Sequence, residues 1–159
     1  MKKKVLPIAL ILFLVAVDQI LKRWAYNYLQ EVGQIHVIEG FFSLTYLENT
    51  GAAFGIMQGQ RWFFVVITIA ILASIGLYYK HIPEGKPHNY LRFTMLIIVA
   101  GAIGNFIDRL LFGFVIDYLH VTFISFPVFN FADILLVVGA IVFSYITIFV
   151  IKDEKKDEK

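Results

Sequence analysis

Two aspartates stand alone in the last third of the sequence. Between Leu110 and Ile151 there is no lysine or arginine, and Asp117 and Asp133 are the only acidic residues. Burying a carboxylate in an apolar environment costs free energy unless a cation compensates it. Two carboxylates without a cation therefore indicate a functional role. If the fold brings them together, both cannot ionise cheaply and one proton is shared. The ionised member can then take a proton from water while its protonated partner polarises a carbonyl, as in aspartic proteases.

The sequence lacks the residues that other hydrolytic mechanisms require. It has no cysteine, no H-E-x-x-H pattern for a zinc peptidase and no G-x-S-x-G pattern for a serine hydrolase. We therefore expect a reaction without a metal or any other cofactor. The net charge of +2 follows from the basic residues that flank the apolar stretches, so no nucleic-acid partner is indicated.

A second group of polar residues lies within the apolar stretches, and each has a structural alternative. Asp18 and Lys22 are four residues apart on one helical face and can pair, which favours a structural role. Asp108 adjoins Arg109, and Asn105 lies one turn before both. These three residues are either part of a site or an internal ion pair that locks the helices together.

Asp133 and Asp117 also have simpler interpretations. Asn130 can cap a helix whose first turn holds Asp133, where the helix dipole favours a carboxylate. His120 is the single ionisable neighbour of Asp117, one turn further on if the segment is helical. Two unpartnered carboxylates at one membrane level favour a site over either simpler interpretation.

The elements that must position these residues are membrane-spanning helices. The sequence is 59% hydrophobic and 16% charged, with a mean hydropathy of +0.75, which is typical of an integral membrane protein. Crossing the hydrocarbon core takes about 20 helical residues. We predict spans at Val5–Trp24, Trp62–Tyr79, Leu91–Leu111 and Phe131–Ile151. The first resembles a cleaved signal peptide in its basic start, but it lacks a clear cleavage site and continues to Trp24, so a retained anchor is expected.

The basic residues set the orientation. Ten of the 14 Lys and Arg residues lie at the start, around 80–92 and in the tail, and the other four are Lys22, Arg23, Arg61 and Arg109. This asymmetry places both termini in the cytoplasm and the loops 25–61 and 112–130 outside. The polar residues described above then gather near the outer face.

The expected fold is therefore an all-α membrane protein with four transmembrane helices, forming a single domain over residues 1–159. In residues 34–49, β-branched and aromatic residues alternate with polar ones, which predicts a small extracytoplasmic β-rich element. The segment 112–130 is expected to form a surface loop or helix. The mixed-charge tail at 152–159 has a composition typical of disorder.

Two other functions compete with a peptidase. A proton-coupled or lipid-moving transporter would have inverted repeats and helices broken near the midplane, neither of which is found. A membrane scaffold would use its acids only for ion pairs, which the interval without cations argues against.

Five sequence blocks match a known family. They are "DQILK" at 18–22, "NTGAAFG" at 49–55, "GAIGNFIDR" at 101–109, "VIDY" at 115–118 and "FPVFNFAD" at 126–133. In this order and spacing they are highly specific, and the chain resembles the lipoprotein signal peptidase (signal peptidase II) family over nearly its whole length. Tyr118 stands where phenylalanine is common in that family, and His120 where an acid is often seen.

The resemblance implies that Asp117 and Asp133 are the catalytic pair of an intramembrane aspartyl peptidase. It implies that Asp18 and Lys22 hold the site together, and that the remaining matching positions position substrate or brace the aspartates: Asn49, Gly51, Asn105, Asp108, Arg109 and Asn130. The implied substrate is a prolipoprotein carrying diacylglycerol, cleaved just before the lipid-modified cysteine. The implied setting is the bacterial cytoplasmic (inner) membrane, with the site near the outer face and membrane lipid in contact. We also expect a monomer that is inhibited by globomycin-type cyclic peptides.

Overall fold

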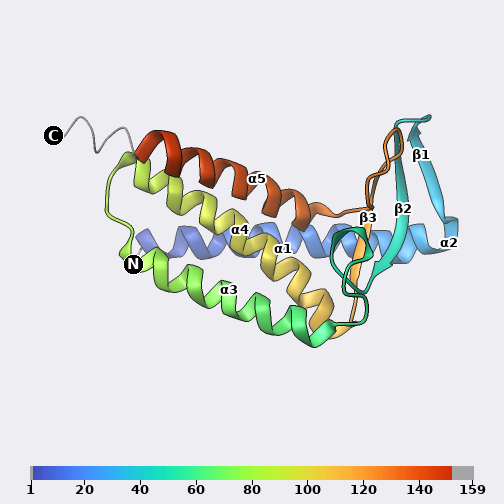
Figure 1. Cartoon of the computed structure of the whole chain (residues 1–159), viewed down its shortest axis with the longest axis horizontal. Coiled ribbons are helices and arrows are strands. Elements are labelled where there is room, and N and C mark those ends of the chain that lie inside the picture. Colours follow the sequence, from blue (N-terminus) through green and yellow to red (C-terminus); the bar gives the residue numbers. More distant parts are fainter. Residues whose placement is uncertain (1, 152–159) are drawn as a thin grey trace.

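The structure is a computed structural model that describes residues 2–151, so the expected disordered tail at 152–159 lies outside the described residues. Four long helices and three strands make up most of it (Figure 1). The elements are α1 (Lys2–Trp24), a π-helical turn (Ala25–Leu29), α2 (Gln30–Val32), β1 (Gln34–Ile38), β2 (Phe42–Asn49), a 3₁₀ turn (Ala53–Gly55), α3 (Arg61–His81), α4 (Lys86–Leu111), β3 (Val115–Val121), α5 (Phe131–Tyr145) and a second π-helical turn (Ile146–Val150).

Helix α4 is the centre of the bundle, because α1, α3 and α5 all pack against it. Small residues let its neighbours approach closely. A Cβ on Gly101 would lie 2.6 Å from the carbonyl oxygen of Ala132, and one on Gly104 would lie 2.5 Å from Asp18 Oδ2. The glycines of α4 therefore bring α1 and the start of α5 to the same place on α4.

The outer surface of the helices is apolar. Within residues 2–151, three helices are long and apolar enough to cross a membrane: Arg61–His81, Lys86–Leu111 and Phe131–Val150. Helix α1 exposes apolar side chains such as Leu12 and Phe13 in its middle turns, but its last two turns hold Asp18, Lys22 and Arg23. The chain is thus mostly helical, with three helices of clear spanning character.

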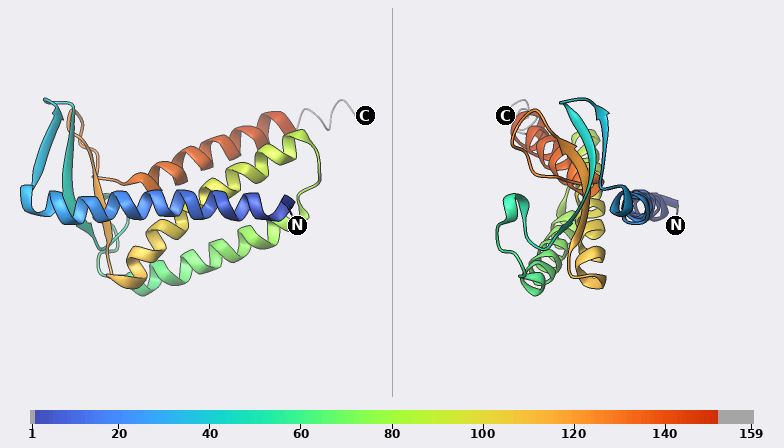
Figure 2. Two further views of the ribbon diagram at one scale, coloured as in Figure 1. Left: turned by 180° about the vertical axis from the view of Figure 1, so that it is seen from behind. Right: turned by 90° about the vertical axis from the view of Figure 1, so that its right-hand side faces the viewer.

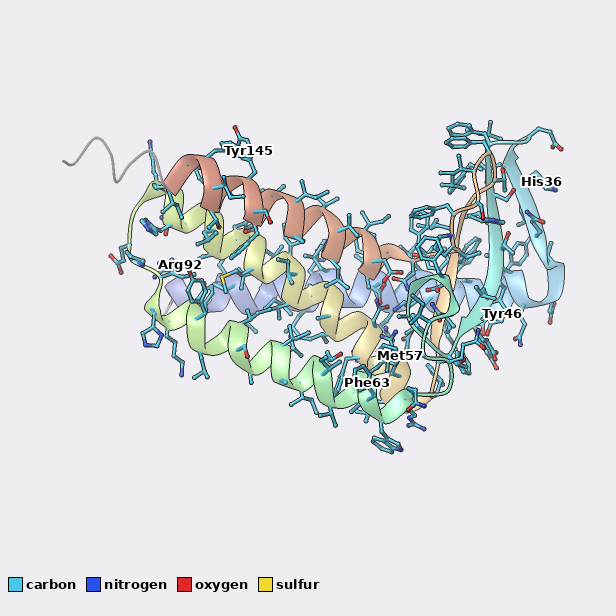
Figure 3. All side chains as sticks on the ribbon, viewed as in Figure 1. His36, Tyr46, Met57, Phe63, Arg92 and Tyr145 are labelled. Atoms are coloured by element: carbon cyan, nitrogen blue, oxygen red, sulfur yellow. The ribbon has the colours of Figure 1, made fainter. Side chains whose placement is uncertain are left out.

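The three strands form one antiparallel sheet in the order β1-β2-β3. The sheet stands at one end of the bundle, and the start of α1 and the last described turn of the chain lie at the other end (Figures 1 and 2). The side-chain view places Tyr46 and Met57 at the sheet end and Arg92 at the opposite end (Figure 3). The predicted β-rich element at 34–49 is confirmed as β1 and β2.

The segment 112–130 differs from the loop or helix expected there, because residues 115–121 form β3 and pair with β2. Both faces of this strand are covered in its first half, where Val115, Ile116, Asp117 and Tyr118 are all buried. Ile116 and Tyr118 pack into an apolar cluster with residues of the turn after α1. An apolar run with β-branched residues is typical of a strand buried on both faces, and it hides the alternation that marks a half-exposed one.

Candidate active site

The pairing of β2 with β3 fixes the position of Asp117. In the register of β2 and β3, Leu47 lies opposite Asp117 and Asn49 lies opposite Val115. Asn49 and Asp117 are therefore diagonal neighbours on one face of the sheet, and Asn49 Nδ2 donates to Asp117 Oδ2 over 2.9 Å. The register shifts between Leu44 and Leu47, which puts a β-bulge directly beside Asp117. Bulges of this kind re-aim a side chain next to a functional site.

The first turn of α5 places Asp133. Asn130 is the N-cap of α5, and its Oδ1 accepts the backbone N–H of Asp133 over 3.0 Å. In return Asp133 Oδ2 accepts the backbone N–H of Asn130, also over 3.0 Å. The capping arrangement considered from the sequence is thus present. It occupies only one carboxylate oxygen of Asp133, so capping and chemistry do not exclude each other.

Both aspartates line one cavity of about 480 Å³. Its polar part holds Asp117 and Asp133 together with Asn49, Asn105 and Arg109. The rest of the wall is apolar, and it is formed by residues 126–129 before α5 and by the α5 side chains Ile134, Leu136, Val137 and Val138. The cavity therefore joins two carboxyl groups to an apolar surface.

Three asparagines aim their amide nitrogens at the two aspartates. Asn49 donates to Asp117 over 2.9 Å, Asn130 Nδ2 donates to Asp117 Oδ1 over 2.6 Å, and Asn105 Nδ2 donates to Asp133 Oδ1 over 2.7 Å. In each case the amide oxygen faces a group that can only donate, which fixes the orientation of the amide. These groups are the N–H of Gly51, the N–H of Asp133 and the ammonium of Lys22.

A buried ionic cluster lies beside the site. Lys22 Nζ is 2.9 Å from Asp18 Oδ2, 3.0 Å from Asp108 Oδ2 and 2.9 Å from Asn105 Oδ1, so all three of its donors are used. Asp18 Oδ1 also accepts the N–H of Ala132 at the start of α5. Asp108 Oδ2 accepts the N–H of Ile116 in β3. The cluster therefore ties α1, α4, α5 and β3 together, as a structural role for Asp18 and Lys22 requires.

The internal ion pair considered for Asp108 is present, but its partner is Lys22 rather than Arg109, because neighbouring residues on a helix point in different directions. Asp108 faces α1 and pairs with Lys22. Arg109 donates from Nη2 to the carbonyl oxygen of Gly51 over 3.0 Å, and its Cζ lies 4.7 Å from the ring centroid of Phe64. Arg109 therefore holds the loop that follows β2.

Gly51 is required by that same loop. A Cβ at this position would lie 2.5 Å from the carbonyl oxygen of Ile56, which leaves no room for a side chain. The N–H of Gly51 donates to Asn49 Oδ1 over 3.0 Å. Gly51 thus links the loop to an amide that contacts Asp117.

Gln19 is a member of the buried ionic cluster that sequence reasoning missed. Its Nε2 lies 3.2 Å from Asp18 Oδ2, 3.0 Å from Asp108 Oδ1 and 3.3 Å from the carbonyl oxygen of Gly104. It therefore supplies a neutral donor to two carboxylates that share one ammonium. The signal was available, because an amide next to Asp18 inside an apolar stretch is itself unusual.

Burial, and to a lesser degree the nearby charge of Asp133, raise the pKa of Asp117 to about 7. The hydrogen bonds from Asn49 and Asn130 act against this shift without cancelling it. Asp117 is only 1% exposed, so the loss of hydration is nearly complete. This carboxyl group therefore retains a proton at a pH where an ordinary aspartate is ionised.

The chain matches known proteins along nearly all of its length. Residues 10–149 match a family model described as signal peptidase (SPase) II. A lipoprotein signal peptidase of Clostridioides difficile (strain 630) is 41% identical over 152 residues, which cover 95% of this chain and 98% of the relative. One of Caldanaerobacter subterraneus subsp. tengcongensis is 46% identical over 147 residues, covering 91% and 97% respectively.

Solved structures resemble the whole fold. Two structures, each described as a bacterial membrane enzyme determined by the in meso method, superpose with TM-scores of 0.81 and 0.79 at 32% identity. The first comparison covers 98% of this chain and 93% of the other, and the second covers 92% and 94%. The similarity thus extends over the helices and the sheet.

Proposed function

The chain belongs to the signal peptidase II family, and we propose that it removes the signal peptide from diacylglyceryl-modified prolipoproteins. In this proposal the peptide bond before the lipid-modified cysteine is hydrolysed. Asp117 and Asp133 act as an aspartyl pair that shares one proton. No covalent intermediate with the enzyme is needed, because water is the nucleophile.

One observation carries the proposal: Asp117 and Asp133 line a single cavity whose remaining wall is largely apolar. The polar part offers an acid and a base to a peptide bond and a water molecule. The apolar part, along α5 and residues 126–129, suits the acyl chains of a lipidated peptide. Partial burial also excludes bulk water and strengthens the electrostatics of the pair.

The supporting residues divide by their contacts. We assign Asp18, Lys22 and Asp108 to holding α1, α4 and β3 together around the site. The three asparagines, Asn49, Asn105 and Asn130, brace the aspartates through their amides, and Gly51 and Arg109 hold the loop that adjoins the cavity. Arg109 also lines the cavity, where it can contact the substrate backbone.

The proposed setting is the bacterial cytoplasmic membrane. A single domain crosses it four times, with α1, α3, α4 and α5 as spans, both termini in the cytoplasm and the sheet outside. The asymmetry of the basic residues and the position of the sheet at the end of the bundle away from the start of α1 support this orientation (Figure 1). A substrate held by its lipid then reaches the cavity by lateral diffusion in the outer leaflet. The protein works as a monomer and is a target for globomycin-type cyclic peptides.

Cleavage of a synthetic diacylglyceryl-modified prolipoprotein peptide by the purified protein tests the proposal. Asp117→Asn and Asp133→Asn should each abolish cleavage while the protein stays folded by size exclusion and thermal melting in detergent. Glu31→Gln, at an exposed acid of α2, is the matched control and should cleave like the wild type. Cleavage retained by both aspartate variants would refute the pair, and cleavage of the unlipidated peptide at the same rate would refute the substrate class.

A further inference from the structure

The two aspartates lie in different electrostatic surroundings. Asp133 is half-buried in the first turn of α5, where the N-terminal end of the helix dipole favours a negative charge. Its two oxygens accept from a backbone N–H and from Asn105. The guanidinium of Arg109 lines the same cavity. Asp133 thus has hydrogen-bond donors and a helix N-terminus around both of its oxygens.

Asp117 has the opposite surroundings. It lies in β3 rather than in the first turn of a helix, and it is almost fully buried. Its donors are two neutral side-chain amides, Asn49 and Asn130. Within residues 2–151, the charge of Asp133 opposes its ionisation, and the charges of Lys22 and Arg109 favour it. The proton of the pair is therefore held more firmly here.

Lys22 reaches Asp133 through a single side chain. Its ammonium binds Asn105 Oδ1 over 2.9 Å, and the other end of that amide donates to Asp133 Oδ1 over 2.7 Å. Because an ammonium has only donors, Lys22 forbids the flipped amide, in which Asn105 would present its oxygen to Asp133. Asn130 Nδ2 also donates to Asn105 Oδ1 over 3.1 Å and favours the same orientation. The ammonium of Lys22 thus polarises the Asn105 amide toward Asp133, although Lys22 does not contact Asp133 itself.

On the basis of the proposed function, we infer that the two aspartates have fixed and different roles. Asp133 is the base that takes a proton from water, and Asp117 is the acid that protonates the scissile carbonyl oxygen. Lys22 sets this division of roles through the side chain of Asn105. In the first step the water oxygen bonds to the carbonyl carbon, one water proton passes to Asp133, and the Asp117 proton passes to the carbonyl oxygen. The resulting gem-diol then collapses. Asp133 protonates the leaving nitrogen as the C–N bond breaks, and Asp117 recovers its proton from a gem-diol hydroxyl. Lys22 and Asn105 are positioning residues in this scheme.

Two matched asparagine variants separate the roles. In the pH profile of kcat/KM, the acidic limb reports ionisation of the base and the alkaline limb reports loss of the acid's proton. Asn105→Ala removes a donor from Asp133, so the acidic limb should move upward by about one pH unit while the alkaline limb stays in place. Asn49→Ala removes a donor from Asp117, so the alkaline limb alone should move upward by a similar amount. A purely structural role would lower the amount of active enzyme and leave both limbs unmoved.

If Asn105→Ala does not fold, Asn105→Asp keeps an oxygen on Lys22 but presents a second acceptor to Asp133. The acidic limb should then move upward further, with kcat affected more than KM. Exchanged limbs in the two asparagine variants, or limbs that do not move, would overturn the assignment while leaving the aspartyl pair intact. Cleavage retained by Asp117→Asn and Asp133→Asn would instead overturn the proposed function itself.

Discussion

Asn130 donates its side-chain amide to Asp117 over 2.6 Å while its amide oxygen accepts the backbone N–H of Asp133 over 3.0 Å. One side chain therefore joins β3 to the first turn of α5 and fixes the two carboxyl groups relative to each other. It is fully buried, so no water competes for these bonds. The helix cap and the candidate site share the same atoms.

This double role can be separated by two substitutions at one position. In Asn130→Ser the hydroxyl still caps α5, but the N–H that reaches Asp117 is lost. We expect near wild-type stability with cleavage reduced by about 10-fold or more, the equivalent of one buried hydrogen bond. Asn130→Ala loses the cap as well, and the free energy of unfolding should fall by about 1 kcal/mol. Thermal melting and cleavage rates on both variants check this, and equal stability loss in the two would contradict it.

Asp18 packs so closely against Gly104 that adding a single methyl group at this position should lower the stability strongly. In Gly104→Ala the new Cβ would meet Asp18 Oδ2 at 2.5 Å and the Ala132 side chain at 3.2 Å. Asp18 cannot move aside without breaking its pair with Lys22, so we expect a loss of about 1–3 kcal/mol in the free energy of unfolding. The matched control is Gly76→Ala in α3, where nothing lies within 4 Å of the new Cβ. That variant should be neutral or slightly more stable because alanine favours the helix.

The sequence predicted the long helices and the two aspartates for the same physical reason. A bilayer demands about 20 apolar residues per span, and within such a background each charged residue is conspicuous. Asp117 and Asp133 were found because no cation lies near them in the sequence.

What the sequence could not show was which partner each polar group selects. Asp108 pairs with Lys22 across two helices rather than with Arg109 beside it, and this depends on which face of α4 meets α1. The strand at 115–121 was missed because burial on both faces removes the alternation that marks a strand. Hydrogen bonds to backbone groups, such as the N–H of Ile116 to Asp108, leave no trace in residue types.

The raised pKa of Asp117 predicts that the stability of the folded protein depends on pH. Its ordinary value in an unfolded chain is 3.8, and burial raises it to about 7 in the fold. Between these values the unfolded chain has released the proton and the folded protein has not, so the free energy of unfolding falls as pH rises. The contribution is fully present below pH 3.8 and is lost by about pH 7. Above that pH, cleavage should also decline as the pair loses its proton.

Thermal melting of the wild type and Asp117→Ala across pH 4 to 8 isolates this group. The melting temperature of the wild type should drop with pH more steeply than that of the variant, because the variant lacks the titrating carboxyl. Groups that do not interact with Asp117 titrate alike in both proteins and cancel in the comparison. Parallel curves would show that Asp117 has an ordinary pKa.

The proposed orientation can be tested directly because the chain has no cysteine of its own. Glu31 in α2 and Glu84 in the loop between α3 and α4 are both exposed acids, and they lie at opposite ends of the bundle (Figure 1). In cells whose envelope lets the reagent reach the outer face of the cytoplasmic membrane, a membrane-impermeant maleimide should label Glu31→Cys at once. It should label Glu84→Cys only after the cytoplasmic membrane is opened. The reverse pattern would place the sheet and the carboxyl pair in the cytoplasm, where a lipidated precursor in the outer leaflet could not reach them.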